Sequence, residues 1–250
     1  MTHIFDHLWR FPPEHLVLAE NEVHIWRVAL DMPASNIQQF SEILADDERC
    51  RADRFRFPQH RSHFIAARGA LRTLIERYSG IPPQELRFEY NQYGKPALSG
   101  AINASFPRFN LSHSGELALY AFAYDRELGI DIEWTRRRID QIDQIARRYF
   151  SEVENMALSA LPEQMRSQAF FNCWTRKEAY IKARGQGLSL PLHQFDVTLA
   201  PGEPAQLLAI RDDPSQLARW TMQVLQPGPD YVAALVVEGK NYDVTYWQFL

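Results

Sequence analysis

Apolar runs separated by polar stretches near the start of the chain predict one strand and one long helix. Residues 23–30 are rich in β-branched and aromatic side chains, which is typical of a strand. Between residues 61 and 78 the apolar positions return at helical spacing, at Phe64, Ala67, Leu71, Leu74 or Ile75, and Tyr78. Gly80 and the pair Pro82-Pro83 end this helix.

The middle and the end of the chain carry more strands mixed with helices. Residues 117–124 form an almost unbroken apolar run, short enough for a strand buried on both faces. A turn at 125–126 and a strand at 128–133 then predict a hairpin. Two helical segments and two closing strands follow, at 139–161, 167–183, 231–237 and 242–249. Because strands and helices do not alternate strictly, the sequence favours an α+β fold.

Composition narrows the class of protein without naming a function. The 250 residues are 46% hydrophobic and 23% charged, as in ordinary globular proteins, and a net charge of −4 gives no basic field for nucleic acid. Two cysteines, Cys50 and Cys173, are too few for a disulfide framework and lack metal-ligand spacing. Neither a signal peptide nor a membrane-spanning run is visible. We therefore expect a cytoplasmic protein with no nucleic-acid or membrane partner.

Basic residues gather locally despite the negative net charge. Five arginines lie close together in the sequence: Arg49, Arg51, Arg54, Arg56 and Arg61. Such a run is either a solvated face or a phosphate-binding patch, and composition does not choose between the two.

Two acidic residues stand two apart in the predicted strand at 128–133. Strand geometry places Asp131 and Glu133 on one face, while Ile130, Ile132 and Trp134 point the other way. Adjacent carboxylates repel each other unless a cation or protons intervene, and oxygen ligands of this kind suit Mg²⁺. Taken alone, however, the alternation favours an ordinary exposed strand over a metal site.

The helical segment at 167–183 carries a stripe in which apolar residues give way to charges. Helical spacing aligns Phe171, Trp174, Glu178 and Lys182. Glu178 and Lys182 can be a plain surface pair, but charges that continue an apolar stripe also mark functional sites. Helix spacing leaves these two readings evenly balanced. Gly185 and Gly187 then end the helix and leave room for a ligand to approach the backbone.

A third cluster precedes the buried strand. Ser112, His113 and Ser114 are predicted as a turn whose hydroxyl, imidazole and backbone donors suit phosphate oxygens. No Gly-x-Ser-x-Gly elbow surrounds the serines, so a nucleophilic triad is not indicated. A locally hydrogen-bonded structural histidine is the alternative.

Taken in order, these motifs resemble the Sfp-type 4′-phosphopantetheinyl transferase family. The matching stretches are Asn-Leu-Ser-His-Ser at 110–114, Gly-Ile-Asp-Ile-Glu at 129–133 and Trp-Thr-Arg-Lys-Glu-Ala-Tyr-Ile-Lys-Ala at 174–183. The likeness spans about residues 49 to 197. It implies transfer of the phosphopantetheine arm of coenzyme A to a serine of an apo-carrier protein, with release of 3′,5′-ADP. It also implies two similar, pseudo-twofold-related α+β halves with the active site at their junction.

The resemblance also implies a role for each motif residue. The halves would be residues 1–126 and 127–250, the second carrying the metal site, and the last strands can pack back on the first half. Mg²⁺ would be held by Asp131, Glu133 and Glu178, with Glu178 also proposed as the base and Lys182 stabilising the departing nucleotide. Coenzyme A contacts are implied for Lys95, Ser112, His113, Lys177 and Lys182. Arg51 and Arg61 are the candidates for its 3′-phosphate, with His63 and Arg68 as alternatives.

Some questions stay open on the sequence alone. Residues 137–151 resemble the region where the family docks its carrier protein, but a helix packing its isoleucines inward fits equally well. A relative that binds coenzyme A or a carrier without chemistry is one alternative function, and a coenzyme A phosphodiesterase is another. The length and the lack of an evident dimerisation segment favour a monomer.

Overall fold

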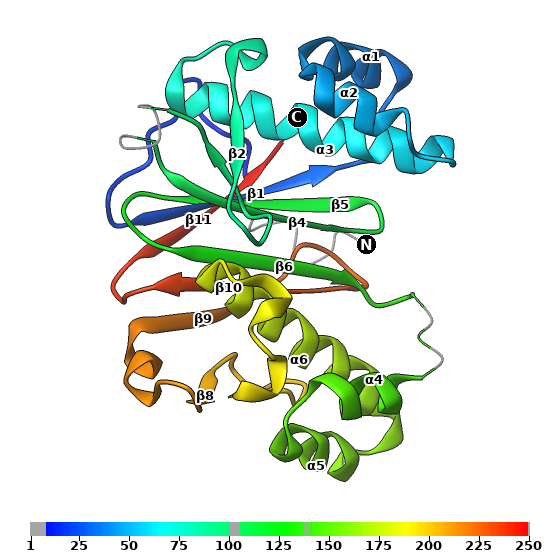
Figure 1. The fold of residues 1–250 in the computed structure, drawn as a ribbon, viewed down its shortest axis with the longest axis vertical. Coiled ribbons are helices and arrows are strands. Elements are labelled where there is room, and N and C mark those ends of the chain that lie inside the picture. The colour runs from blue at the N-terminus through cyan, green and yellow to red at the C-terminus, as the bar shows by residue number, and fades with distance from the viewer. Residues whose placement is uncertain (1–8, 101–105, 138, 140, 250) are drawn as a thin grey trace.

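Two β-sheets lie face to face between two long helices, as a computed structural model of the chain shows (Figure 1). Residues 9–100, 106–137, 139 and 141–249 are described. One sheet has the strand order β11-β1-β5-β4 and the other β6-β10-β9. The mixture of helices and antiparallel strands confirms the predicted α+β class.

The first half of the chain builds one helix-covered sheet. Its elements are β1 (Glu22–Ala29), α1 (Ala34–Ile43), α2 (Asp46–Ala52), α3 (Pro58–Ser79), η1 (Pro83–Glu85), β2 (Phe88–Tyr90), β3 (Pro96–Leu98), β4 (Arg108–Ser114) and β5 (Leu117–Ala123). Helix α3 begins a little before the predicted residue 61 because Pro58 fits the first turn of a helix, where its missing N–H is not needed. It ends where Gly80 takes a left-handed conformation, with φ of 69°.

The second half repeats this order. Its elements are β6 (Leu128–Trp134), α4 (Ile142–Tyr149), α5 (Glu152–Ala160), α6 (Glu163–Arg184), η3 (Gly187–Ser189), η4 (Leu192–Gln194), β7 (Phe195–Val197), β8 (Leu207–Ile210), η5 (Pro214–Arg219), β9 (Trp220–Leu225) and β10 (Tyr231–Glu238), followed by β11 (Asp243–Gln248). The segment predicted as one helix at 139–161 is two helices. The break falls at Ser151, which caps α5: its hydroxyl accepts from Glu154 N, and its own N–H donates to the Glu154 carboxylate.

The predicted hairpin of residues 117–124 and 128–133 is wrong. Strand β5 has β1 on one edge and β4 on the other, so it offers no free edge to β6. The chain therefore crosses to the second sheet, where β6 pairs antiparallel with β10. Residues 112–114 are also not a turn. They complete β4, and the turn to β5 comes at Gly115, where φ is 56°.

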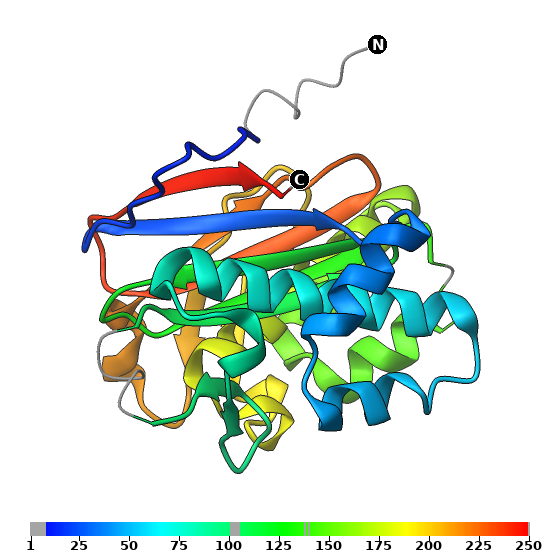
Figure 2. The same cartoon turned by 90° about the horizontal axis from the view of Figure 1, so that it is seen from above.

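The last strand of the chain joins the sheet of the first half. Strand β11 pairs in parallel with β1, from Glu22↔Asp243 to Arg27↔Gln248 (Figure 2). Strands β10 and β11 follow each other in the sequence but belong to different sheets. In the described part of the chain, no helix is both long enough and apolar enough to cross a membrane.

Strands in the middle of the molecule are buried on both faces. In β1, Val23 and Ile25 face the second sheet, while Trp26 and Val28 pack under α3. In β10, Leu235 faces the first sheet and Val236 packs against α6. Three apolar layers therefore hold the two sheets and the two helices together.

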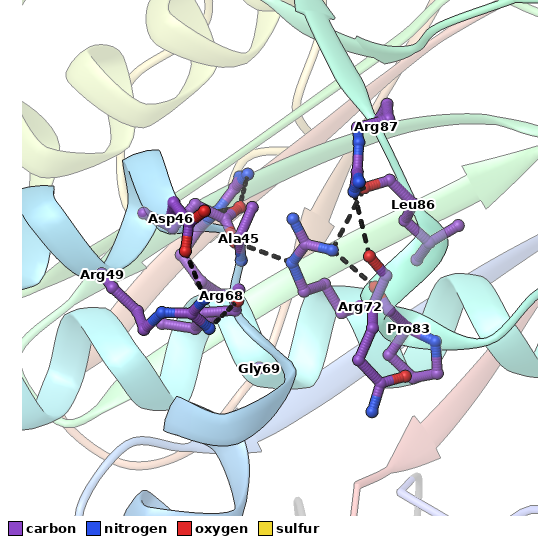
Figure 3. A network of polar contacts seen from close by, with 12 residues as sticks. Ala45, Asp46, Arg49, Arg68, Gly69, Arg72, Pro83, Leu86 and Arg87 are labelled. Atoms are coloured by element: carbon purple, nitrogen blue, oxygen red, sulfur yellow. Dashed lines mark hydrogen bonds and ion pairs between the residues drawn. The ribbon is translucent and has the colours of Figure 1, made fainter.

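A buried ion pair ties the short helices to the long helix in each half. In the first half Arg72 Nε donates to Glu48 Oε2 over 2.7 Å, and its guanidinium also bonds to the Pro83 carbonyl (Figure 3). In the second half Lys177 Nζ lies 2.8 Å from Glu154 Oε2. Arg72 and Lys177 hold the same position in two helices of 22 residues each. The repeated element order thus extends to individual side chains.

Candidate functional site

The predicted acidic residues lie at a seam between the halves, where β4 runs beside β6. The two strands belong to different sheets, and side chains of β4 bridge the gap. Asn110 Oδ1 accepts from Ile130 N at 2.9 Å, and Ser114 Oγ accepts from Trp134 N at 3.0 Å. Side chains here take the place that backbone carbonyls hold within a sheet.

Gly129 brings helix α6 against the other side of β6. A Cβ atom on Gly129 would lie 2.1 Å from the Ala179 carbonyl oxygen and 2.3 Å from Ala183 N, so only glycine allows this approach. The sequence interpretation used this residue only as part of the motif at 129–133 and did not predict the close approach. A glycine inside an apolar strand indicates close backbone approach, and that cue was available.

Asp131 is the centre of the contacts at the seam. It is only 5% exposed, and its Oδ1 accepts from Lys182 Nζ at 2.7 Å and from Ser112 Oγ at 2.8 Å. Its second oxygen, Oδ2, is buried and has no hydrogen-bond partner among the described residues. An unsatisfied buried carboxylate oxygen is costly, which indicates a ligand position.

Glu133 and Glu178 share the electrostatic field of Asp131. Burial and the negative charge of Asp131 raise the pKa of Glu133. Burial, followed by the charge of Asp131, raises the pKa of Glu178 to about 7, although Lys182 acts in the opposite direction. Carboxylates that raise a neighbour's pKa in this way favour a bound cation or protons between them.

The donor set fits a hard divalent cation. All three acidic side chains offer oxygen, and Asp131 Oδ2 is the orphaned atom among them. Within the described ranges, no three acidic, histidine or cysteine side chains are already gathered into a metal-binding cluster. Mg²⁺ commonly binds through one or two carboxylates together with water and substrate phosphates, so a complete protein cage is not needed.

Positively charged groups act on His113 of β4 from several elements. Successive strand residues point to opposite faces, so His113 points away from the face of Ser112. Desolvation lowers the pKa of His113, and so do the positive charges of Lys182, His63 and Arg51. His63 is itself held by Asp31, with Nε2 2.5 Å from Oδ1. This cluster beside the carboxylates suits an anion.

The other residues predicted to contact coenzyme A bond to groups of the protein itself. Arg61 forms an ion pair with Asp53 at 3.0 Å, and Arg68 binds the buried Glu48. Lys95 Nζ lies 3.0 Å from Glu127 Oε2, near the start of β6. The Ser112 hydroxyl donates to Asp131 and accepts from Lys182 at 2.9 Å, so within the protein it serves the acidic site.

The prediction that Lys177 contacts phosphate is wrong. Its side chain is fully buried, and Nζ bonds to the carbonyls of Leu192 and Phe195 at 2.7 and 2.6 Å as well as to Glu154. Lys177 and Glu178 are neighbours in the sequence, but a helix points them about 100° apart. Only Glu178 shares the partly exposed stripe of α6 with Trp174 and Lys182.

Aromatic and apolar contacts support the helix that carries Glu178. Trp174 stacks on Phe170, with ring centroids 6.1 Å apart, and meets Tyr149 edge to face. Ile139, Ile142 and Ile145 pack against the core of the second half. The structure therefore favours the inward-packing reading of residues 137–151.

Comparisons with known proteins agree with the motifs. Residues 32–124 match the family model "4′-phosphopantetheinyl transferase, N-terminal", and residues 127–236 match "4′-phosphopantetheinyl transferase superfamily". The 4′-phosphopantetheinyl transferase HetI of Nostoc sp. is 39% identical over 98% of this chain and 100% of its own length. The 4′-phosphopantetheinyl transferase Sfp of Bacillus subtilis is 32% identical over 70% of this chain and 76% of its own.

A solved structure gives a more distant likeness. The holo-(acyl-carrier-protein) synthase of Bacillus anthracis, in complex with coenzyme A (3′,5′-ADP), is 21% identical with a TM-score of 0.37. The match covers 45% of this chain and 94% of that one.

Proposed function

Because this chain belongs to the 4′-phosphopantetheinyl transferase family and transfers the phosphopantetheine arm of coenzyme A to a serine of an apo-carrier protein, we propose that the transfer takes place at the β4–β6 seam. The family and the transferase activity predicted from the motifs are thereby confirmed. The monomeric state and the cytoplasmic location stay predictions.

One observation carries the placement of the site. The orphaned Oδ2 of Asp131 is buried, and Lys182 Nζ lies 2.7 Å from the Oδ1 atom of the same carboxylate. The charge of Asp131 also acts on Glu133, Glu178 and His113. Such a site can hold a cation on its acidic side and a phosphate on its basic side. We assign Asp131, Glu133 and Glu178 to Mg²⁺. When bound, the ion would polarise the phosphoryl group and neutralise developing charge.

The residues of this chain then divide the work of the reaction. The carrier serine oxygen forms a new bond to the phosphorus that carries the pantetheine arm, and the bond from that phosphorus to 3′,5′-ADP breaks. The serine proton passes to the Glu178 carboxylate, directly or through water. Lys182 Nζ stabilises the departing phosphate, while Arg51 and His113 hold coenzyme A by its phosphates.

The test is a change in mass of the carrier. The protein is incubated with Mg²⁺, coenzyme A and a panel of apo-carriers, and each carrier is weighed by intact mass spectrometry. We expect at least one carrier to gain one phosphopantetheine group, with no gain when its serine is replaced by alanine or when a chelator is added. No gain on any carrier would overturn the proposal. Release of 3′,5′-ADP without a carrier would instead indicate a phosphodiesterase.

A further inference from the structure

We propose that Ser114 is a positioning residue that orients the Glu133 carboxylate for the metal. The inference rests on the proposed metal-binding role of Glu133. Ser114 lies on β4, in the first half, whereas Glu133 lies on β6, in the second. One side of the junction would thus fix a metal ligand supplied by the other.

The Ser114 hydroxyl is held by two contacts at once. Its Oγ donates to Glu133 Oε2 over 2.8 Å and accepts from Trp134 N over 3.0 Å. A hydroxyl has one proton to donate, so the bond to Glu133 fixes its direction. The two hydrogen bonds therefore keep the Ser114 hydroxyl directed at the Glu133 carboxylate.

Arg137, a cationic neighbour of Glu133, holds the carboxylate only loosely. Arg137 NH2 lies 3.8 Å from Glu133 Oε1, beyond hydrogen-bond length, and its side chain is 56% exposed. The Glu133 side chain is 14% exposed. An exposed pair at this distance fixes little, so the orientation of the carboxylate depends on Ser114.

Ser114 is one of three polar side chains that alternate along the edge of β4. Asn110, Ser112 and Ser114 point to the same face because each is two residues from the next. They meet Ile130 N, the Asp131 carboxylate and the Glu133 carboxylate in turn. This side-chain ladder sets the register of β6 against β4. It therefore fixes the two proposed metal ligands on β6, Asp131 and Glu133, relative to His113, which is on the same strand as the ladder.

The strand end that carries Ser114 is itself supported. A Cβ atom on Gly115 would lie 2.9 Å from Tyr231 Oη and 3.2 Å from Trp134, so the turn is closely covered by β6 and β10. Glu116 N donates to Tyr231 Oη over 3.1 Å. A support of this kind keeps a positioning group in place.

The experiment measures metal binding without coenzyme A or a carrier. Mn²⁺ is titrated into the full chain and its free concentration is followed by electron paramagnetic resonance. Replacing Ser114 by alanine is expected to weaken binding by about 10-fold or more, as for other residues that orient metal ligands. Ser114→Thr retains the hydroxyl and should keep affinity near wild type. Ser159→Ala removes an exposed hydroxyl on α5 and serves as the matched control.

A transfer assay separates positioning from general damage. At low Mg²⁺ the alanine variant should be slow, and raising Mg²⁺ should recover most of its kcat, because the ligand is misoriented rather than lost. If Ser114→Ala does not fold, Ser114→Cys keeps the volume with a weaker donor and should show the same loss.

Two results would overturn the inference in distinguishable ways. If folded Ser114→Ala binds Mn²⁺ as tightly as wild type, Ser114 does not position Glu133, while the proposed site can stand. If the wild-type chain binds no Mn²⁺, the metal assignment itself fails, and the role of Ser114 fails with it.

Discussion

The two halves of the molecule share a backbone plan but differ in what occupies the same place. Strands β1-β5-β4 and β6-β10-β9 have the same order, and α3 and α6 both end at a left-handed glycine. Strand register sets Ala29 opposite Leu117 and Trp134 opposite Tyr231, which aligns Trp26 with Asp131 and Val28 with Glu133. Helix positions align Thr73 with Glu178 and Arg77 with Lys182.

The first half fills its version of the site with apolar core. Trp26 is fully buried, and its indole N–H bonds to Tyr78 Oη at 2.8 Å. Arg77 lies over the Trp26 ring, 5.8 Å from its centroid, instead of pairing with a carboxylate. The same frame thus holds a packed core in one half and a charged site in the other. Chemistry here is decided by a few side chains rather than by the fold.

The distance between helix and strand also differs. The place of Gly129 is taken in the first half by His24, a buried residue whose ring bonds to Tyr78 Oη at 2.8 Å. A layer of side chains therefore separates α3 from β1, whereas backbone meets backbone between α6 and β6. That close contact puts Lys182 beside Asp131.

Replacing equivalent residues in the two halves tests the comparison most strongly. Glu178→Gln keeps size and removes charge, and we expect the transfer rate to fall by about 10³-fold or more, because both a ligand and the proposed base are lost. Thr73→Ala, at the equivalent place in the first half, should leave the rate near wild type. Single-turnover rates on one carrier measure both. Equal effects of the two substitutions would break the comparison.

The buried ion pairs should differ in cost between the two halves. Lys177→Met leaves the buried Glu154 without its cation and should reduce the free energy of unfolding by about 3–5 kcal/mol. Arg72→Met should cost less, because Glu48 keeps its ion pair with Arg68. Urea unfolding measures the loss. Folded Lys177→Met should keep the wild-type KM for coenzyme A, since Lys177 is an internal brace. A raised KM at normal stability would restore its predicted phosphate contact.

The tight contact at Gly129 gives the next largest effect. Gly129→Ala forces a methyl group into the backbone of α6, and we expect a loss of about 3 kcal/mol together with weaker Mn²⁺ binding. Gly228→Ala is the control, because its Cβ would meet only Leu117, at 3.9 Å. Thermal unfolding should show a large drop in Tm for the first variant and little change for the second.

The smallest expected effect is a dependence of the stability of the metal-free protein on pH. The pKa of Glu178 is raised from 4.5 to about 7 on folding, so the native state binds more protons than the unfolded state between these values. Stability of the metal-free wild type should therefore fall as pH rises from about 4.5 to 7. Glu178→Gln removes this loss and should be more stable by on the order of 1 kcal/mol at pH 8, after discounting for solvent screening. The gain should vanish near pH 4.5, and a constant gain would indicate another cause.

Local signals in the sequence predicted the long elements well. Periodic apolar residues and terminal glycines located α3 and α6, because both cues act within a few residues of the helix. Strand pairing depends on partners far along the chain. The hairpin of β5 and β6 was predicted from their closeness in sequence, and it fails because β1 and β4 already flank β5.

The sequence predicted which residues carry the chemistry of the site, but only some of the contacts that these residues make. Spacing put Asp131 and Glu133 on one face and aligned Glu178 with Lys182, since both periods are fixed by the backbone. Lys177 was misplaced because a family motif gives order along the chain and not the direction of a side chain. Ser114 was predicted only as a phosphate donor, because its bond to Glu133 joins two residues that lie 19 positions apart and in different sheets.

The parallel pairing of β11 with β1 has a consequence for how the protein is made. Strand β1 leaves the ribosome long before its partner at 243–248, because the whole second half lies between them in the sequence. During synthesis one edge of the first sheet stays open while the second half is translated and begins to fold. An open edge is a site for mispairing, so the nascent chain is exposed there until β11 has been translated. The half that is translated first is therefore the half that is completed last.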